Sequence, residues 1–207
     1  MKMQLLGAVC ALSLIGAGIA TAQNADQPGH KSPAPGSSNG TMAAMKDATM
    51  GAVGVVSAEM TTTTKGFVAA AATSDMYEVE AGKIAQERAR SAKVKDFGAQ
   101  MVQAHTATSA ALKKILAGNN VAVTPPAHLD DRRQSLIDSL RGIKAEDFDH
   151  RYLEQQEAAH KEAQILMRGY AKSGDNAAIK QFAADTLPKV EDHLKMIEVL
   201  EGEKPSK

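Results

Sequence analysis

HRYLEQQEAAHKEAQILM, residues 150–167, decides the class of fold. Counting back from Tyr170 in steps of three and four residues gives a row that includes Met167, Ala163, His160, Gln156 and Leu153. This spacing predicts an amphipathic helix that turns His160 toward the protein interior. A buried imidazole needs a hydrogen-bond partner or a metal ion, so the same stretch also raises the question of a site.

Helical spacing continues through most of the chain after residue 63, and the alternation typical of strands is absent. Gly118-Asn119-Asn120 and Pro125-Pro126 interrupt the pattern, Asp175 is expected to cap the last helix, and Pro188 predicts a kink within it. The sequence therefore predicts an all-α fold, an antiparallel four-helix bundle with a short extra helix in the crossover between the second and third long helices. The expected long helices are 64–90, 92–117, 145–172 and 176–200, and the short one is 130–140.

The first 22 residues have the pattern of a secretory signal peptide. The apolar run LLGAVCALSLIGAGIA follows Lys2, and Ala20 and Ala22 form an A-x-A cleavage site. We expect cleavage near Ala22 and a periplasmic or secreted protein, with a retained anchor as the alternative. No transmembrane span is expected once this segment is removed, because no later apolar run is long enough. The only cysteine, Cys10, would leave with the signal, which excludes disulfides and cysteine-ligated metals.

Two further segments differ in composition from the helical part. Residues 23–62 are rich in Pro, Gly, Ser, Thr and Ala and poor in large apolar side chains, which predicts a disordered tether. Residues 203–207 predict a frayed tail. The domain expected to fold is therefore 63–202.

Composition argues against nucleic acid as a partner. The chain has 24 basic and 24 acidic residues, so it has no excess positive charge to attract a polyanion. Aromatic residues make up 3% of the chain and tryptophan is absent, so stacking platforms for single strands are also lacking.

Each predicted long helix carries one ionisable residue within its apolar stripe, namely Glu78, His105, His160 and His193. Antiparallel packing would place the first three in one layer, because each lies near the middle of its helix. His193 lies past its helix midpoint by about five residues, a displacement of roughly 7 Å. Glu157, one turn before His160, shares nearly the same face and adds a possible carboxylate.

Three interpretations of these polar residues stay open. A carboxylate with several imidazoles in a helical core suits one divalent metal ion such as zinc, copper, iron or manganese. Alternatively, the groups hydrogen-bond one another and fix the register of the helices without a metal. In the third interpretation the predicted stripes are one position out of place, and some of the histidines face solvent.

Four motifs, in order along the chain, resemble those of an exported bacterial family of unknown function with a ferritin-like fold. They are FVAAAATSDMYEVEAGKIA, MVQAH, FDHRYLEQQEAAH and LPKVEDHL. The similarity extends over residues 65–200, and members of the family are often labelled outer membrane proteins. The resemblance implies a ferritin-like bundle and an envelope location, but no established activity.

The wider ferritin-like superfamily binds two metal ions through glutamates and E-x-x-H motifs. By this resemblance Glu78 matches the first glutamate, and His105 and His193 match the motif histidines. Valines, Val102 and Val190, stand where the motif glutamates should be. A di-iron centre, and with it ferroxidase or oxygenase chemistry, is therefore not expected.

The sequence favours an exported, non-catalytic binding or interaction protein of the cell envelope, connected with stress, over an enzyme. Its partner would be an envelope protein or a metal ion. The alternative function is binding of a single divalent metal in the core of the bundle. The candidate ligands for that metal are Glu78, His105, Glu157, His160 and His193.

Overall fold

The computed structural model describes residues 61–202, and no strand occurs among them. The predicted all-α class is confirmed. The signal peptide expected at 1–22, almost all of the tether at 23–62, and the tail at 203–207 lie outside the described residues. The helices are α2 Thr64–Arg88, α3 Ala92–Gly118, α4 Asp131–Gly142, α5 Phe148–Ser173 and α6 Ala177–Gly202, and a single turn of 3-10 helix, η1 Ala145–Asp147, precedes α5.

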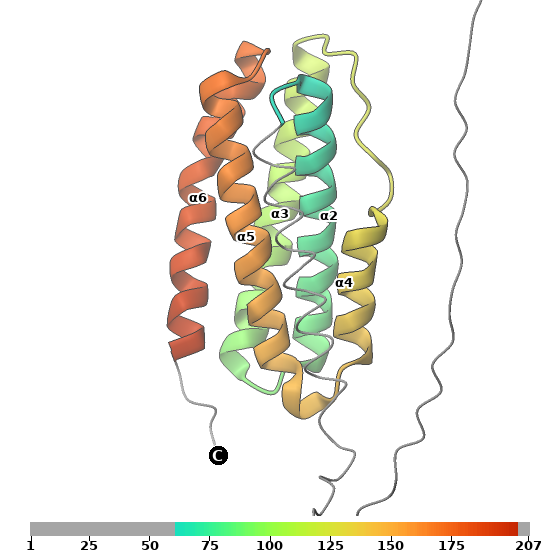
Figure 1. Ribbon diagram of the computed structural model, residues 1–207, viewed down its shortest axis with the longest axis vertical. Helices are drawn as coiled ribbons and strands as arrows, with labels where there is room; N and C mark the ends of the chain where they lie inside the picture. The colour runs from blue at the N-terminus through green and yellow to red at the C-terminus, as the bar shows by residue number, and fades with distance from the viewer. Residues whose placement is uncertain (1–60, 203–207) are drawn as a thin grey trace, which may run out of the picture. The chain divides into compact units, whose positions relative to one another are not determined.

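The four long helices lie side by side, and α4 lies outside them (Figure 1). α2 packs mainly on α3, and α5 packs mainly on α6. The two pairs meet where α2 contacts α5 and where α3 contacts α6, while α4 covers α2 and α5. α2 and α5 are antiparallel, since Thr64 at the start of α2 lies 2.8 Å from the hydroxyl of Tyr170 near the end of α5.

Side chains at the helix starts explain where α2, α4 and α6 begin. Thr63 caps α2, and Asp130 caps α4 by accepting a hydrogen bond of 2.8 Å from the backbone N–H of Arg133. The prediction that Asp175 caps α6 is wrong. Asn176 accepts from two backbone N–H groups of the first turn instead, while the Asp175 carboxylate accepts from Thr64 and Tyr170. Asp175 therefore joins the start of α2 to the α5–α6 turn.

α6 runs from Ala177 to Gly202 with Pro188 inside it. The kink expected at this proline stays a prediction. None of the described helices combines the length and apolarity that crossing a membrane requires.

Two glycines allow α2 and α3 to approach closely. A Cβ atom added to Gly82 would lie 2.6 Å from the carbonyl oxygen of Gly98, and one added to Gly98 would lie 2.8 Å from that of Gly82. Both distances are shorter than a carbon–oxygen contact allows. The two positions therefore require residues without a side chain.

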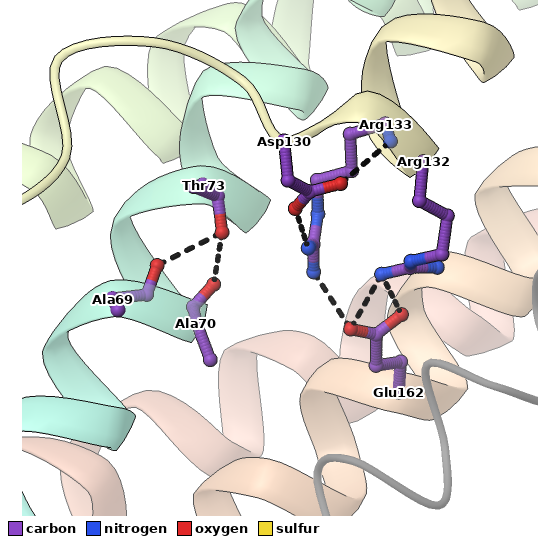
Figure 2. A network of polar contacts seen from close by, with 7 residues as sticks. All are labelled: Ala69, Ala70, Thr73, Asp130, Arg132, Arg133 and Glu162. Carbon is purple, nitrogen blue, oxygen red and sulfur yellow. Dashed lines mark hydrogen bonds and ion pairs between the residues drawn. The ribbon is translucent and has the colours of Figure 1, made fainter.

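Polar contacts hold α4 against α5 (Figure 2). The buried carboxylate of Glu162 on α5 accepts from Arg132 at 2.8 Å and from Arg133 at 2.7 Å, and Arg133 also pairs with Asp130 at 2.7 Å. The same view shows Thr73 of α2, whose hydroxyl donates to carbonyls of its own helix. At the other end of α4, the guanidinium of Arg88 donates to three backbone carbonyls. These contacts fix the crossover beside the long helices.

The apolar core is divided into two clusters. One contains Tyr77, Phe97, Phe148, Tyr152 and Ile197, and the other contains Phe67, Leu112, Tyr170, Ile179 and Phe182. On α3, α5 and α6 the predicted histidines lie, in sequence, between the parts of the helix that enter the two clusters, and on α2 Glu78 directly follows Tyr77, the first residue of that helix in its cluster. The ionisable side chains therefore form a polar layer between two apolar regions.

Candidate metal centre

The structure brings the three predicted histidines together. Ring centroids lie 5.3 Å apart for His160 and His193, 5.6 Å for His105 and His160, and 5.8 Å for His105 and His193. One ligand nitrogen from each ring lies within 4.8 Å of the others. The displacement expected for His193 does not separate its ring from the other two.

His160 is fully enclosed, with 1% of its surface exposed. Its Nδ1 lies 2.9 Å from the backbone carbonyl of Gln156, to which it must donate, so its Nε2 carries a lone pair. That Nε2 lies 3.2 Å from Nδ1 of His193. Burial, followed by the neighbouring charges of His105 and His193, holds the pKa of His160 well below 6.5. His160 is therefore a neutral imidazole with its free nitrogen facing the other rings.

His193 is the most accessible of the three, being half-buried at the edge of the group. Burial and, to a smaller extent, the charge of His105 lower the pKa of His193 from 6.5 to about 4, and Asp192 partly opposes the shift. His193 is therefore also neutral at pH 7, the state in which imidazole coordinates a metal.

His105 is held by a carboxylate that the sequence analysis missed. Asp75 Oδ1 lies 2.8 Å from Nδ1 of His105, and Asp75 Oδ2 accepts from the hydroxyl of Ser109 at 3.0 Å. Burial alone would lower the pKa of His105, but the hydrogen bond to Asp75 and the charge of Glu78 raise it overall. Nε2 of His105 is buried and has no hydrogen-bond partner. It is therefore the nitrogen left free for a ligand.

Glu78 lies beside the histidines but is not among the converging ligand atoms. Its Oε1 is 3.8 Å from Nδ1 of His160, too far for a hydrogen bond, and its buried Oε2 has no partner. Burial raises the pKa of Glu78 to about 7, although the charge of His105 and the nearby amide of Gln156 act in the opposite direction. Glu78 is therefore a buried acid poised to ionise when positive charge enters the layer.

Glu157 is not brought into the group. Its carboxylate pairs with Lys161 at 2.5 Å, and 36% of its side chain is exposed. A position three residues before His160 is turned by about 60° around the helix, which is enough to carry its side chain to the surface of α5. The possible carboxylate ligand predicted at Glu157 is therefore directed elsewhere.

Helical spacing makes Asp75 a candidate, although the same three-residue offset carries Glu157 to the surface of α5. Asp75 lies three residues before Glu78, on nearly the same face of α2, and is itself 5% exposed. Asp75 would then be a second carboxylate in the apolar stripe, one turn from Glu78. Two buried carboxylates require partners, so this pattern indicates a polar site.

Comparison with known proteins gives a family but no activity. The family model of a domain of unknown function, DUF4142, matches residues 52–200. The chain belongs to this family. No curated protein and no solved structure matches the chain. Any function must therefore be inferred from the geometry of the site.

Two of the three ligand nitrogens lie at the separation that one metal ion requires, and those of all three rings lie within 4.8 Å of one another. Zinc–nitrogen bonds of 2.0–2.1 Å at tetrahedral angles place two ligand nitrogens about 3.4 Å apart. The 3.2 Å between the nitrogens of His160 and His193 is close to that separation. The contact of Asp75 with the far nitrogen of His105 is the type of carboxylate–histidine pair that orients a metal ligand and raises its basicity.

Proposed function

We propose that this protein binds one divalent metal ion through His105, His160 and His193, and that it does so as a non-catalytic protein. The observation that carries the proposal is the convergence of three buried or half-buried imidazole nitrogens within 4.8 Å of one another. Two of these rings are held neutral by burial, and the third is oriented by Asp75. Zinc and copper suit such a set of nitrogen ligands.

Charge balance supports a divalent ion. Asp75 and Glu78 are buried carboxylates beside the histidines, with exposed fractions of 5% and 1%. Together they can supply two negative charges, Asp75 through its contact with His105 and Glu78 once it ionises. A buried ion of charge +2 would be neutralised without any further group. In this proposal Glu78 balances charge, and a direct bond from Glu78 to the ion is not required.

The alternative is a purely structural polar network. The bond between His160 and His193 and the bond between His105 and Asp75 would serve such a network well. However, the network leaves Nε2 of His105 and Oε2 of Glu78 buried without partners. An unsatisfied buried polar group costs about 1–3 kcal/mol, and a metal ion in the layer would remove that cost at His105.

The fold and location belong to the same proposal. The packing of the four long helices and the four sequence motifs support a ferritin-like four-helix bundle of an exported bacterial family. The segment 1–22 supports export to the periplasm or the medium. Valines at 102 and 190 support a single ion rather than a di-iron pair, since two bridging carboxylates are missing.

Thermal unfolding with and without metal tests the function. We expect Zn²⁺ or Cu²⁺ to raise the melting temperature of chelator-treated protein, because an ion that binds only the folded form stabilises it by about 2.7 kcal/mol at a hundredfold excess over Kd. His160→Leu and His193→Ala should abolish the rise. His150→Leu is the matched control, because His150 is 78% exposed and pairs with Glu154 on its own helix.

The structural network predicts a different set of results. If no metal salt shifts the melting temperature and elemental analysis of protein purified without chelators shows no metal, metal binding is wrong. An equal rise in the wild type and in His160→Leu would also contradict the proposal, since the ion would then bind elsewhere.

A further inference from the structure

The three histidines by themselves do not complete the coordination of a metal ion. Among residues 61–202, His105, His160 and His193 are the group whose possible ligand atoms converge within 4.8 Å. Structural zinc sites take four ligands from the protein, whereas sites at which ligands exchange take three and leave the fourth position to solvent. The group that fills the fourth position therefore decides whether this site is closed or open.

Neither buried carboxylate of the layer supplies the fourth ligand. Asp75 uses one oxygen on the far nitrogen of His105, at 2.8 Å, and the other on the hydroxyl of Ser109, at 3.0 Å. Glu78 approaches His160 at Nδ1, at 3.8 Å, whereas the nitrogen free for a metal is Nε2. A fourth tetrahedral ligand would lie about 3.4 Å from each ring nitrogen. Glu78 does not belong to the converging group even at 4.8 Å, so neither carboxylate binds the ion directly.

Unpartnered polar atoms lie beside the histidines. Within the described part of the chain, Oε2 of Glu78 has no hydrogen-bond partner, and neither amide atom of Gln156 has one. The two residues are enclosed, with 1% and 0% of their surfaces exposed. Gln156 precedes His160 by one turn of α5, and its amide lies near enough to Glu78 to lower the pKa of that carboxyl. Buried polar atoms are nearly always hydrogen-bonded in native proteins, so these atoms need a further partner.

A solvent molecule on the ion would be such a partner for Glu78. An oxygen ligand lies about 2.1 Å from zinc, and an O–H···O hydrogen bond spans about 2.7 Å. At a tetrahedral angle, a carboxylate oxygen that holds this solvent molecule lies roughly 4 Å from the ion, just outside the ligand group. We propose that the ion takes one solvent molecule as its fourth ligand and that this molecule donates a hydrogen bond to Oε2 of Glu78.

This inference rests on the metal-binding function proposed above and makes the site an open one. The ion has three protein ligands and one position at which a small ligand can exchange, which a closed structural site lacks. The enclosure of His160 and Glu78, each 1% exposed, restricts that position to ligands of about the size of water.

Pulsed electron paramagnetic resonance of the full chain loaded with Cu²⁺, in H₂O and in D₂O, tests the two proposals separately. Modulation by the remote nitrogens of three imidazoles reports the metal site, and deuteron coupling of the strength of directly bound water reports the fourth ligand. We expect both signals in the wild type. Glu78→Leu removes the acceptor and places methyl groups there, so it should lose the deuteron signal and keep the nitrogen signal.

Two further variants serve as controls. Glu78→Gln keeps an acceptor oxygen and should keep the deuteron signal. Glu157→Leu removes a carboxylate that pairs with Lys161 at the surface of α5, and it should behave as the wild type does. A nitrogen signal without bound deuterons in the wild type, or an unchanged deuteron signal in Glu78→Leu, would overturn the open site and leave the metal site standing. Loss of the nitrogen signal from the wild type would contradict the metal site itself, and the fourth ligand with it.

Discussion

At the scale of the residue, burial and partners give neighbouring imidazoles different properties. His160 and His193 are desolvated without a carboxylate partner in hydrogen-bond contact, so their pKa values fall. His105 is also buried, but Asp75 holds a proton on its Nδ1, and its pKa rises instead. The layer therefore combines two neutral rings with one ring that is easily charged.

The metal-free protein should be most stable near pH 6.5. Between pH 4.5 and 6.5 the unfolded chain carries protons on His160 and His193 but not on Glu78. In the folded chain Glu78 is protonated, and His160 and His193 are neutral. Unfolding then takes up about one net proton, so stability rises with pH. Above pH 6.5 the raised pKa values of Glu78 and His105 reverse the sign, and stability falls.

Urea unfolding in a chelator, repeated from pH 4.5 to 8, measures this dependence. His193→Gln removes one of the two groups that take up protons, so its stability should rise less steeply with pH below pH 6.5. A free energy of unfolding that keeps increasing above pH 7 in the wild type would show that Glu78 is ionised in the folded protein.

The sequence could identify the histidines because helical spacing alone turns them inward. Steps of three and four residues place His105, His160 and His193 in apolar stripes, and the structure brings all three together. The spacing could not reveal the bond between Asp75 and His105, which depends on how α2 and α3 rotate against each other. Helical spacing also could not predict that Glu157 lies at the surface, because a rotation of only about 60° around the helix separates an inner position from an exposed one.

At the scale of the element, close contact between α2 and α3 positions His105 beside Asp75 and Glu78. Gly82 and Gly98 make that contact possible, because a Cβ at either position would strike backbone of the other helix. The starts of α2 and α4 follow from the capping side chains of Thr63 and Asp130. The close approach of α2 and α3 is harder to predict from the sequence, since a glycine within a predicted helix also lowers its helix propensity.

Gly82→Ala should destabilise the protein by about 1–3 kcal/mol, the usual cost of overpacking a tight contact. Gly169→Ala is the control, because a Cβ there would meet no atom within 4 Å. It should stabilise α5 by roughly 0.5–1 kcal/mol, since alanine favours helix. Urea denaturation of both variants measures the difference, and equal effects of the two substitutions would contradict the close approach.

At the scale of the whole molecule, two helix pairs meet through a polar layer. α2 with α3 supplies Asp75, Glu78 and His105, and α5 with α6 supplies His160 and His193. A metal ion in this layer would therefore link the two pairs. Periodicity predicted the four long helices and the short helix 130–140, which corresponds to α4 Asp131–Gly142, but it could not predict that α4 packs against α2 and α5.

A crystal structure of the zinc-loaded protein, with anomalous data at the zinc edge, tests the central claim most directly. The account predicts one zinc ion per chain within about 2.1 Å of a ring nitrogen of His105, His160 and His193. An anomalous peak at another position, such as the exposed pair of His150 and Glu154, with the three rings still hydrogen-bonded only to protein groups, would contradict it.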